Sequence, residues 1–268
     1  MAKRITKKDI YKEFGIEYDT TTEKILSPIG WINPLMVDGN EKIGHGVFHF
    51  SMLPGKKEFN VTVNGQEMKM FGTCSDDCPG CYGFTGNYAM YKDPYNNLAV
   101  RTIIAREHID FFKAAIMAQI KADKVKAVRI HATGDFFSKE YLNAWIEIVA
   151  KNPDIVFWSY TKEYGAENAF NEFKNANIVK SNVLDKGYNY GTAEYVIALY
   201  NMLRDLGKET YICRCGIDKN QHCTNCKACA LCEHVLFLEH GTKYNPKKDS
   251  AFPAFKALVD SQGDKYLN

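Results

Sequence analysis

Several features of membrane-spanning and nucleic-acid-steered chains are missing from this sequence. No apolar run reaches the ~18 residues that a transmembrane helix needs, and the first residues are polar, so we expect neither a membrane partner nor a signal peptide. Lysine and arginine number 34 and the acidic residues 32, which gives a net charge of +2. This balance does not favour strong steering toward nucleic acid, although a local basic face is compatible with it. We expect a cytoplasmic protein.

Internal repeats and low-complexity segments are also missing. The apolar share of 46% and the charged share of 25% are ordinary for a globular protein with a packed core. At 268 residues the chain is long enough for one large domain. We expect a single domain over residues 1–268 with three parts. These are a β-rich layer over 1–70, an α/β part over 71–212 and a cysteine-rich segment over 213–268.

Cysteine is abundant, and its distribution is uneven. The nine cysteines form two groups separated by a long interval without any, and they are Cys74, Cys78, Cys81, Cys213, Cys215, Cys223, Cys226, Cys229 and Cys232. In a chain without a secretion signal, cysteines in this number favour metal binding over a disulfide framework. Clustering favours the same interpretation, because the ligands of one metal centre usually come in groups.

The first group has the spacing C-x3-C-x2-C, in a loop that contains Pro79-Gly80. A turn at these two residues lets the three sulfurs converge. Thiolates are soft ligands suited to iron–sulfur clusters or to zinc, and both kinds of site normally take four ligands. Either a remote cysteine supplies the fourth ligand, or one iron stays open for an exogenous ligand. The alternative to an iron–sulfur cluster is a zinc site in which a residue elsewhere in the chain supplies the fourth ligand.

The second group is a C-x-C pair followed by three C-x2-C steps. Ferredoxin-like runs place three cysteines at two-residue gaps on one [4Fe-4S] cluster and take a fourth from further away. We therefore expect Cys223, Cys226 and Cys229 to bind a second cluster with one member of the pair, and Cys232 to be spare or to exchange with Cys229. The leftover member of the pair could complete the first cluster, which would remove its open iron. A zinc knuckle is the rival interpretation.

The first quarter of the chain has mostly strand signals after a short helix over residues 5–14. Asn64-Gly65 stands between two short alternating segments, 59–63 and 67–71. This dipeptide favours a two-residue hairpin turn, because such a turn needs positive φ at both central positions. The sequence therefore predicts a β-rich layer that leads into the first cysteine loop.

The middle of the chain alternates between helical and strand patterns. Helices are predicted over 98–121, from Ser138 as a capping residue, over 167–175 and over 193–206, and strands over 68–71, 125–130, 155–162, 177–183 and 209–212. Such alternation is typical of a parallel sheet built from βαβ units. We expect an α/β fold with a partial (β/α) barrel, and a doubly wound open sheet is the alternative. Arg101 and Arg106 on the first helix either face solvent or contact an anionic ligand.

Polar residues follow the predicted strands. In parallel α/β folds, ligands gather at the carboxyl ends of the strands. The residues at these positions are the first cysteine group, Thr133-Gly134-Asp135, Ser159, Thr161, Lys162, Asn182, Asp185, Cys213 and Cys215. We expect them to share one rim of the sheet.

Two families resemble the sequence around these residues. The spacing of the first cysteine group is similar to the cluster loop of the radical S-adenosylmethionine (SAM) superfamily. Cys81-Tyr82-Gly83 and the later Gly134-Asp135-Phe136-Phe137-Ser138 resemble the gene product 88 family of phage-encoded iron–sulfur proteins. That resemblance covers residues from about 71 to 232, brings no established activity, and the family itself resembles radical-SAM barrels.

The radical-SAM resemblance implies a cofactor site. Three cysteines would hold a [4Fe-4S] cluster, and SAM would chelate its open iron. Gly134 would let the backbone approach SAM and Asp135 would pair with its ammonium group, although a plain turn with a capping carboxylate also explains this motif. The other residues that this resemblance places next to SAM are Tyr82, Thr133, Ser159, Lys162 and Asn182. The aromatic residue that usually precedes the third cysteine is replaced by Gly80.

Two functions remain open on these grounds. The first is a radical-SAM-like enzyme with two clusters, in which a reduced cluster passes an electron to SAM and the resulting radical abstracts hydrogen from an unknown substrate. The second is a non-catalytic phage-type iron–sulfur protein with a structural or redox-sensing role that contacts nucleic acid or a host protein. Zinc at the C-terminal site is the alternative cofactor.

Overall fold

The computed structural model describes residues 4–39, 44–75, 81–84, 87–91, 93–163, 165–181, 187–214, 217–218, 221–238, 245 and 248–266. Cys78, Asn182 and Cys215, which have predicted roles, lie outside these residues, and for Tyr82 the backbone alone is described. Within the described part of the chain, no helix is long and apolar enough to cross a membrane.

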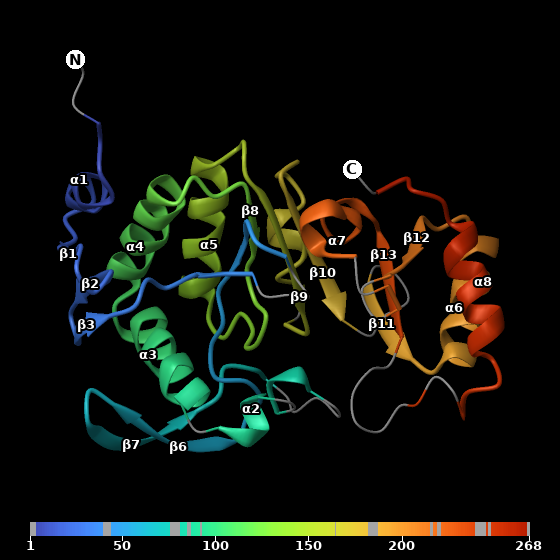
Figure 1. Ribbon diagram of the computed structural model, residues 1–268, viewed down its shortest axis with the longest axis horizontal. Helices are drawn as coiled ribbons and strands as arrows, with labels where there is room; N and C mark the ends of the chain where they lie inside the picture. The colour runs from blue at the N-terminus through green and yellow to red at the C-terminus, as the bar shows by residue number, and fades with distance from the viewer. Residues whose placement is uncertain are drawn as a thin grey trace.

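An eight-stranded sheet forms the centre of the protein (Figure 1), in the order β12-β13-β11-β10-β9-β8-β5-β4. Its strands are β4 (Val37–Asp38), β5 (Val47–His49), β8 (Ala127–Arg129), β9 (Val156–Thr161), β10 (Ala176–Ser181), β11 (Gly187–Gly191), β12 (Thr210–Ile212) and β13 (His234–Leu238). All neighbours from β5 to β12 pair in parallel, and β4 pairs antiparallel with β5 at one edge.

From β5 to β11 the strands lie side by side in chain order. This is the order of a singly wound (β/α) barrel, whereas a doubly wound open sheet reverses its order near the middle. The described edge strands, β4 and β12, do not pair with each other. The partial barrel therefore stays a prediction, with a strand order that favours it over the doubly wound alternative.

The helices are α1 (Lys7–Glu13), α2 (Asn87–Met90), α3 (Asp93–Glu107), α4 (Ile109–Ala122), α5 (Lys139–Lys151), α6 (Ala193–Asp205), α7 (Ala228–Leu231) and α8 (Phe252–Ser261). Three short 3-10 helices add to these, η1 (Tyr82–Phe84), η2 (Asn168–Phe170) and η3 (Cys223–Asn225). The predicted cap of α5 is confirmed, because the Ser138 hydroxyl accepts a hydrogen bond from the backbone N–H of Tyr141 at 3.1 Å. α6 and α8 pack against each other and against β12 and β13.

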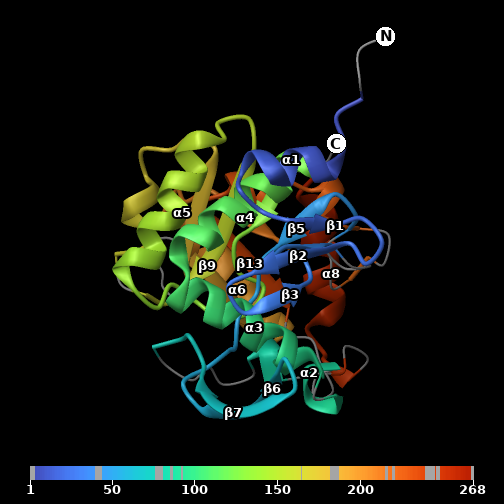
Figure 2. The ribbon, with the colours of Figure 1, turned by 90° about the vertical axis from the view of Figure 1, so that its left-hand side faces the viewer.

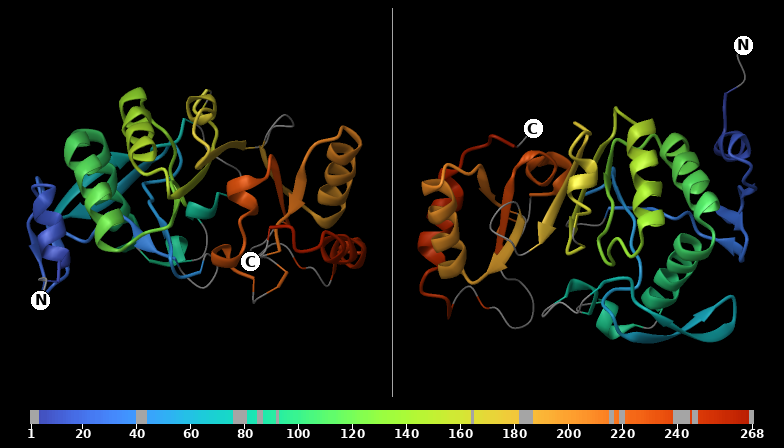
Figure 3. Two further views of the ribbon diagram at one scale, coloured as in Figure 1. Left: turned by 90° about the horizontal axis from the view of Figure 1, so that it is seen from above. Right: turned by 180° about the vertical axis from the view of Figure 1, so that it is seen from behind.

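Different elements pack on the two faces of the sheet. Successive residues of a strand point to opposite faces, so neighbouring side chains contact different elements. Phe157 and Ile178 point toward the main core, in which Trp145 of α5 is fully buried. Trp158 and Val47 point the other way and pack with the cysteine-rich segment that contains α7. Figure 3, seen from above, shows α4 and α5 on one side of the sheet and α7 on the other.

Two small antiparallel sheets flank the central one. β1 (Tyr18–Asp19), β2 (Lys24–Ser27) and β3 (Gly30–Ile32) form the N-terminal layer, and β6 (Glu58–Val63) pairs with β7 (Gln66–Phe71). Figure 2 shows the N-terminal layer in front and the β6–β7 hairpin at the bottom. The predicted hairpin is confirmed, with Asn64 and Gly65 at φ of 50° and 79°.

Some predicted elements are wrong, each for a local reason. Residues 68–71 belong to the hairpin and not to the parallel sheet, whose first strand is β5. The single helix predicted over 98–121 is two helices, because His108 leaves the helical region with φ −136° and ψ 55°. The helix predicted over 167–175 is reduced to the single turn η2.

Two strands of the sheet were missed by the sequence patterns. β11 has the sequence Gly-Tyr-Asn-Tyr-Gly, which contains no β-branched residue. β13 lies in the interior of the sheet between β11 and β12, although it follows β12 in the chain. The cysteine-rich segment is therefore the connection between β12 and β13, and this placement holds it against the sheet.

Candidate metal centre

The described part of the first cysteine loop lies at the carboxyl end of β5. The chain that leaves β5 continues beside the chain that leaves β8, since the Met52 N–H donates to Thr133 O at 3.0 Å. After the β6–β7 hairpin it returns to the same place, where the Thr73 N–H donates to Leu53 O at 2.9 Å and the Cys74 N–H to Gly55 O at 3.1 Å. The hairpin is thus an insertion between β5 and its cysteine loop.

Backbone contacts also orient the Cys74 side chain. The Gly55 N–H points at the Cys74 sulfur, at a nitrogen–sulfur distance of 3.2 Å. Hydrogen bonds from backbone N–H groups to cysteine sulfur are a common feature of iron–sulfur sites, where they tune the reduction potential. The Cys74 and Cys81 side chains are both partly exposed.

Gly134 brings the loop after β8 against this cysteine loop. Its φ is +86°, and a Cβ atom built at this position would lie 2.6 Å from Thr73 Oγ1 and 3.0 Å from Met52 Cβ. Only glycine fits this conformation and this contact without displacement. Thr133 is buried beside it and donates its hydroxyl to Met52 O at 2.9 Å. Thr133-Gly134 therefore lies beside Thr73, the residue before Cys74, and its role toward a ligand stays a prediction.

Asp135 is buried, and both of its carboxylate oxygens are occupied by protein donors. Oδ1 accepts hydrogen bonds from the Thr161 hydroxyl at 2.6 Å and from the Phe136 N–H at 2.8 Å. Oδ2 accepts one from the Lys162 N–H at 2.8 Å. Burial raises the pKa of the Asp135 carboxyl to about 6, against the effect of these hydrogen bonds. Asp135 therefore joins the ends of β8 and β9, and its role toward SAM stays a prediction.

Glu163 is a residue at this rim that the sequence did not single out. Its carboxylate accepts a hydrogen bond from the Ser75 N–H at 3.1 Å, inside the cysteine loop. The end of β9 is thereby tied to the loop directly after Cys74. The signal that could have found it is a carboxylate placed directly after the end of a predicted strand.

Ser159 is not brought to the rim with the other predicted residues. It is fully buried, and its hydroxyl lies 3.3 Å from the Nδ1 atom of His131. His131 in turn lies 2.9 Å from the hydroxyl of Tyr141 on α5. Ser159 therefore points toward the helix-covered face of the sheet. Lys162 does lie at the rim, where its backbone contacts Asp135.

The second cysteine group brings four thiols together on the opposite face of the sheet. Cys213, Cys226 and Cys229 pack against one apolar cluster, and Cys223 and Cys229 pack against a second one that contains Val47 of β5 and Trp158 of β9. Burial raises the pKa of the Cys229 thiol, and the neighbouring Cys223 and Cys226 raise it further. The predicted trio with Cys213 or Cys215 as a ligand set stays a prediction, because Cys215 lies outside the described residues.

Two tyrosine side chains stand beside these thiols. Burial raises the pKa of the Cys226 thiol, and the nearby Tyr211 hydroxyl acts to lower it. The Tyr160 hydroxyl has the same relation to Cys229. Arg129 stacks its guanidinium over the Tyr160 ring, 5.8 Å from the centroid. The thiols are thereby surrounded by aromatic rings and by a positive charge that would favour their ionised form.

Cys232 belongs to the same apolar cluster as Cys213, Cys226 and Cys229, but its thiol bonds to the backbone. Its side chain is fully buried, and its thiol donates to the backbone oxygens of His234 at 3.1 Å and Glu209 at 3.5 Å. These bonds hold the chain at the start of β13. Of the two sequence-based possibilities, this placement favours the spare residue over an exchange with Cys229.

Comparison with known proteins decides the family. The profile of the family described as gene product 88 matches residues 35–243, which is more than half of the chain and includes every cysteine. The chain belongs to the gene product 88 family. No solved protein structure matches it.

Two curated gene product 88 relatives match the chain over short segments. The Gene 88 protein of Mycobacterium phage L5 is 51% identical over 37 residues, which is 14% of this chain and 16% of that protein. The Gene 88 protein of Mycobacterium phage D29 is 38% identical over 64 residues, or 23% of this chain and 24% of that protein. The matches therefore span less than a quarter of each curated relative.

We call Cys213, Cys223, Cys226 and Cys229 the rear group, and Cys74, Cys78 and Cys81 the front group. The four thiols of the rear group are ligands of the kind that a thiolate-bound metal centre needs. Four cysteine side chains of the connection between β12 and β13 pack against two apolar clusters that share Cys229, and no disulfide links any of the seven cysteines that the structure describes. As they are placed, no three His, Cys, Asp or Glu side chains among the described residues are close enough to hold a metal ion. Metal binding at the rear group would therefore need the four sulfur atoms to move closer to one another.

Proposed function

We propose that this gene product 88 protein binds iron–sulfur clusters at two places. The rear cluster would be held by Cys213, Cys223, Cys226 and Cys229, and the front cluster by Cys74, Cys78 and Cys81. The single observation that carries the proposal is the grouping of the four rear thiols, which lie on the connection between β12 and β13 and pack against two apolar clusters that share Cys229. Four cysteines are the full ligand set of a [4Fe-4S] cluster.

The surroundings of the rear thiols support iron–sulfur over zinc as the cofactor. Hydrogen bonds to the sulfurs and a buried, aromatic shell are the features by which proteins tune cluster potential. Tyr211 and Tyr160 supply hydroxyl groups next to Cys226 and Cys229. A zinc site with four thiolates remains the alternative, since zinc takes the same ligand set.

At the front site, we propose that the three cysteines leave one iron open for SAM. When bound there, a reduced cluster supplies the electron that cleaves SAM and starts radical chemistry on a substrate. The protein's own part would be to hold the loop in place through Gly55 and Thr73, and to bring Gly134 against it without a side chain. The absence of a Cβ at this position lets Thr73, the residue before Cys74, pack directly against the Gly134 backbone.

Two observations favour the non-catalytic alternative. The Asp135 carboxylate, which would pair with the ammonium group of SAM, is already engaged by three protein donors. The cysteine-rich segment covers the sheet face opposite α4 and α5, which would be the inner face of a barrel. In this second candidate function, the clusters stabilise the fold or sense redox state while the protein contacts nucleic acid or a host protein.

Spectroscopy of the chain purified without oxygen tests the two parts of the proposal, which are iron–sulfur binding and SAM binding. Iron–sulfur binding predicts visible charge-transfer absorption that bleaches with dithionite. SAM binding predicts a changed electron paramagnetic resonance spectrum of the reduced chain when SAM is added, together with 5′-deoxyadenosine in the products. Bleachable absorption without any SAM response supports the non-catalytic function. A colourless chain that contains zinc contradicts both.

A further inference from the structure

The chain that leaves α8 returns to the segment that carries the rear group (Figure 1). We call residues 262–266 the return segment. Its first residue, Gln262, bonds through its side-chain amide to the backbone of Ile212, accepting from the N–H at 2.6 Å and donating to the oxygen at 3.2 Å. Ile212 is the last residue of β12 and directly precedes Cys213. The return segment is therefore bonded to the chain on one side of this thiol.

Arg214, on the other side of the same thiol, is held as well. Its guanidinium donates to the backbone oxygen of Gly263 at 2.7 Å and to the carboxylate of Asp264 at 3.0 Å. The Arg214 side chain is 16% exposed and that of Asp264 is 78% exposed, so the bond to the backbone oxygen is the one shielded from solvent. Both chain neighbours of Cys213 thus contact the return segment.

The far end of the return segment reaches a second thiol of the rear group. The backbone oxygen of Tyr266 accepts a hydrogen bond from the Lys227 N–H at 2.9 Å. Lys227 directly follows Cys226. Two cysteines from different stretches of the connection between β12 and β13 are therefore tied to one short piece of chain.

The Tyr266 side chain adds burial to these backbone contacts. It is 8% exposed, and it belongs to the same apolar cluster as Tyr211, against which Cys213 and Cys226 pack. The two tyrosine rings meet edge to face, with centroids 5.1 Å apart. The Tyr266 hydroxyl donates to the carboxylate of Glu209, the residue before β12. The ring is thereby fixed over the cluster.

These contacts restrict how far the two thiols can separate. A few residues of chain have a short and fixed reach, so bonds at both ends of the return segment limit the distance between the stretches that they join. Thiols held near one another lose less conformational freedom when they bind a common metal ion.

We propose that the return segment is a clamp that positions Cys213 and Cys226 as neighbours and slows the opening of the rear group. Tyr266 and Gln262 are its positioning residues. The effect on a bound metal rests on the proposed function, whereas the effect on the exposure of the thiols does not.

Alkylation of the full chain, purified without oxygen and kept reduced, tests the clamp at each cysteine. Mass spectrometry after timed exposure to iodoacetamide gives separate rates for Cys213, Cys226 and Cys81. Tyr266→Ala should raise the first two rates at least about tenfold relative to Cys81, since it removes a buried ring and a hydrogen bond to a carboxylate. Unchanged ratios overturn the proposal.

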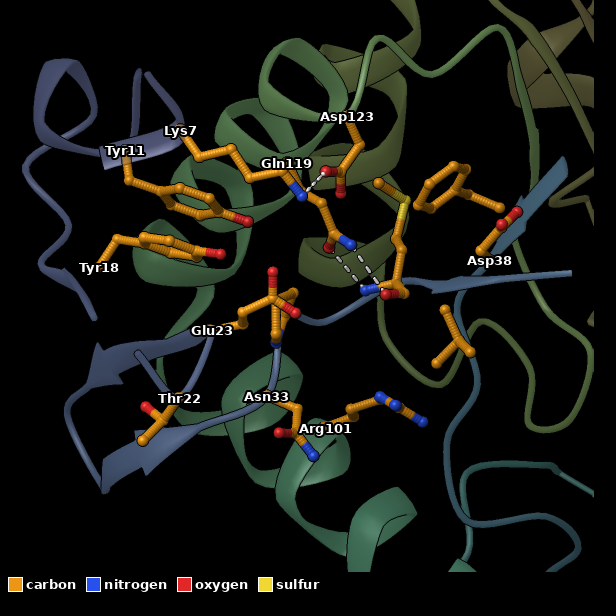
Figure 4. A pocket seen from close by; sticks show the side chains of 14 residues that line it. Lys7, Tyr11, Tyr18, Thr22, Glu23, Asn33, Asp38, Arg101, Gln119 and Asp123 are labelled. Atoms are coloured by element: carbon orange, nitrogen blue, oxygen red, sulfur yellow. Dashed lines mark hydrogen bonds and ion pairs between the residues drawn. The ribbon is translucent and has the colours of Figure 1, made fainter. Parts of the chain in front are cut away.

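Tyr18 offers a matched control at the other end of the molecule. It is 5% exposed, and its ring stacks on that of Tyr11 with centroids 5.0 Å apart, beside a cavity of about 400 Å³ (Figure 4). Tyr18→Ala should destabilise the fold without changing the alkylation of Cys226 relative to Cys81. An equal rise in that ratio in both alanine variants would reflect a general loss of stability and overturns the proposal.

Two further variants separate the contacts of the clamp. Tyr266→Phe keeps the ring and should restore most of the protection that Tyr266→Ala loses. Gln262→Ala removes two hydrogen bonds from a half-buried side chain and should raise the Cys213 rate at least about threefold. An unchanged Cys213 rate in this variant, with folding checked by circular dichroism, overturns the proposal even if Tyr266→Ala unfolds.

Iron release distinguishes a failure of the clamp from a failure of the proposed function. Transfer of rear-group iron to a chelator should be at least about tenfold faster from Tyr266→Ala than from the unsubstituted chain, because its ligands separate more readily. Equal release rates overturn the proposal. A chain that holds no iron contradicts the proposed function, and the alkylation rates then decide whether the clamp exists.

Discussion

The two cysteine groups of this gene product 88 protein are held by different kinds of interaction. Backbone hydrogen bonds at the rim of the sheet hold the described part of the front loop, through Gly55 and Thr73. Apolar packing against the sheet holds the rear group, in which Cys213, Cys226 and Cys229 share a cluster with Tyr211. The difference implies that the rear group is part of the folded core, whereas the front loop is a ligand site added at its edge.

Cys229→Ser is expected to have the largest effect on iron content and on the free energy of unfolding. Loss of a rear ligand should remove about four of the eight irons of two clusters, and should lower the free energy of unfolding by more than ~4 kcal/mol, because metal binding and folding are coupled there. Iron analysis and chemical denaturation measure both quantities. Cys232→Ser is the control: it should keep all iron, since its thiol bonds to backbone oxygens. Loss of iron from that variant instead would reverse the ligand assignment.

Cys81→Ser should have an equal effect on iron and a small effect on stability. The front cluster should be lost, again about four irons, while the free energy of unfolding changes by only ~1 kcal/mol because the loop lies at the rim. Any response to SAM should disappear with it. A loss of stability as large as that of Cys229→Ser would show that the two regions do not differ in the proposed way.

The pH dependence of stability separates the rim from the rest of the sheet. The pKa of Asp135 is raised to about 6 from an ordinary value of 3.8, so the folded rim binds a proton more tightly than the unfolded chain does. This stabilisation is fully present below about pH 4 and is lost as the pH rises through about 6, a change of ~3 kcal/mol. Hydrogen exchange of residues 133–136 and 161–163 between these pH values should show it.

Asp135→Asn is the matched variant for that measurement. It should remove the pH dependence of exchange at the rim and leave that of α6 and α8 as it was. If the pH dependence of hydrogen exchange at the rim persists in Asp135→Asn, another group is responsible for the titration.

Gly134→Ala should have a smaller effect on stability than the titration of Asp135. A methyl group there meets Thr73 Oγ1 at 2.6 Å and φ is +86°, so a loss of ~2 kcal/mol and weaker front-cluster binding are expected. Gly207→Ala has a similar φ of +71° with no atom within 4 Å and should cost only ~1 kcal/mol without any change in iron. Equal effects of the two variants would mean that the contact with Thr73 is unimportant.

Local sequence signals predicted the features that depend on a few adjacent residues. Asn64-Gly65 predicted the hairpin, and Ser138 predicted a helix start. Features set by distant contacts were not predictable in this way. β13 takes an interior position beside β11, and Glu163 reaches Ser75 across the rim, because of tertiary packing that no periodicity contains.

Iron and acid-labile sulfide, counted per chain in protein purified without oxygen, test the central claim most directly. Two thiolate-bound clusters predict about eight irons and eight sulfides, and about four of each in Cys81→Ser and in Cys229→Ser. Zinc in place of iron, or a chain that binds no metal with all nine cysteines reduced, would contradict the account.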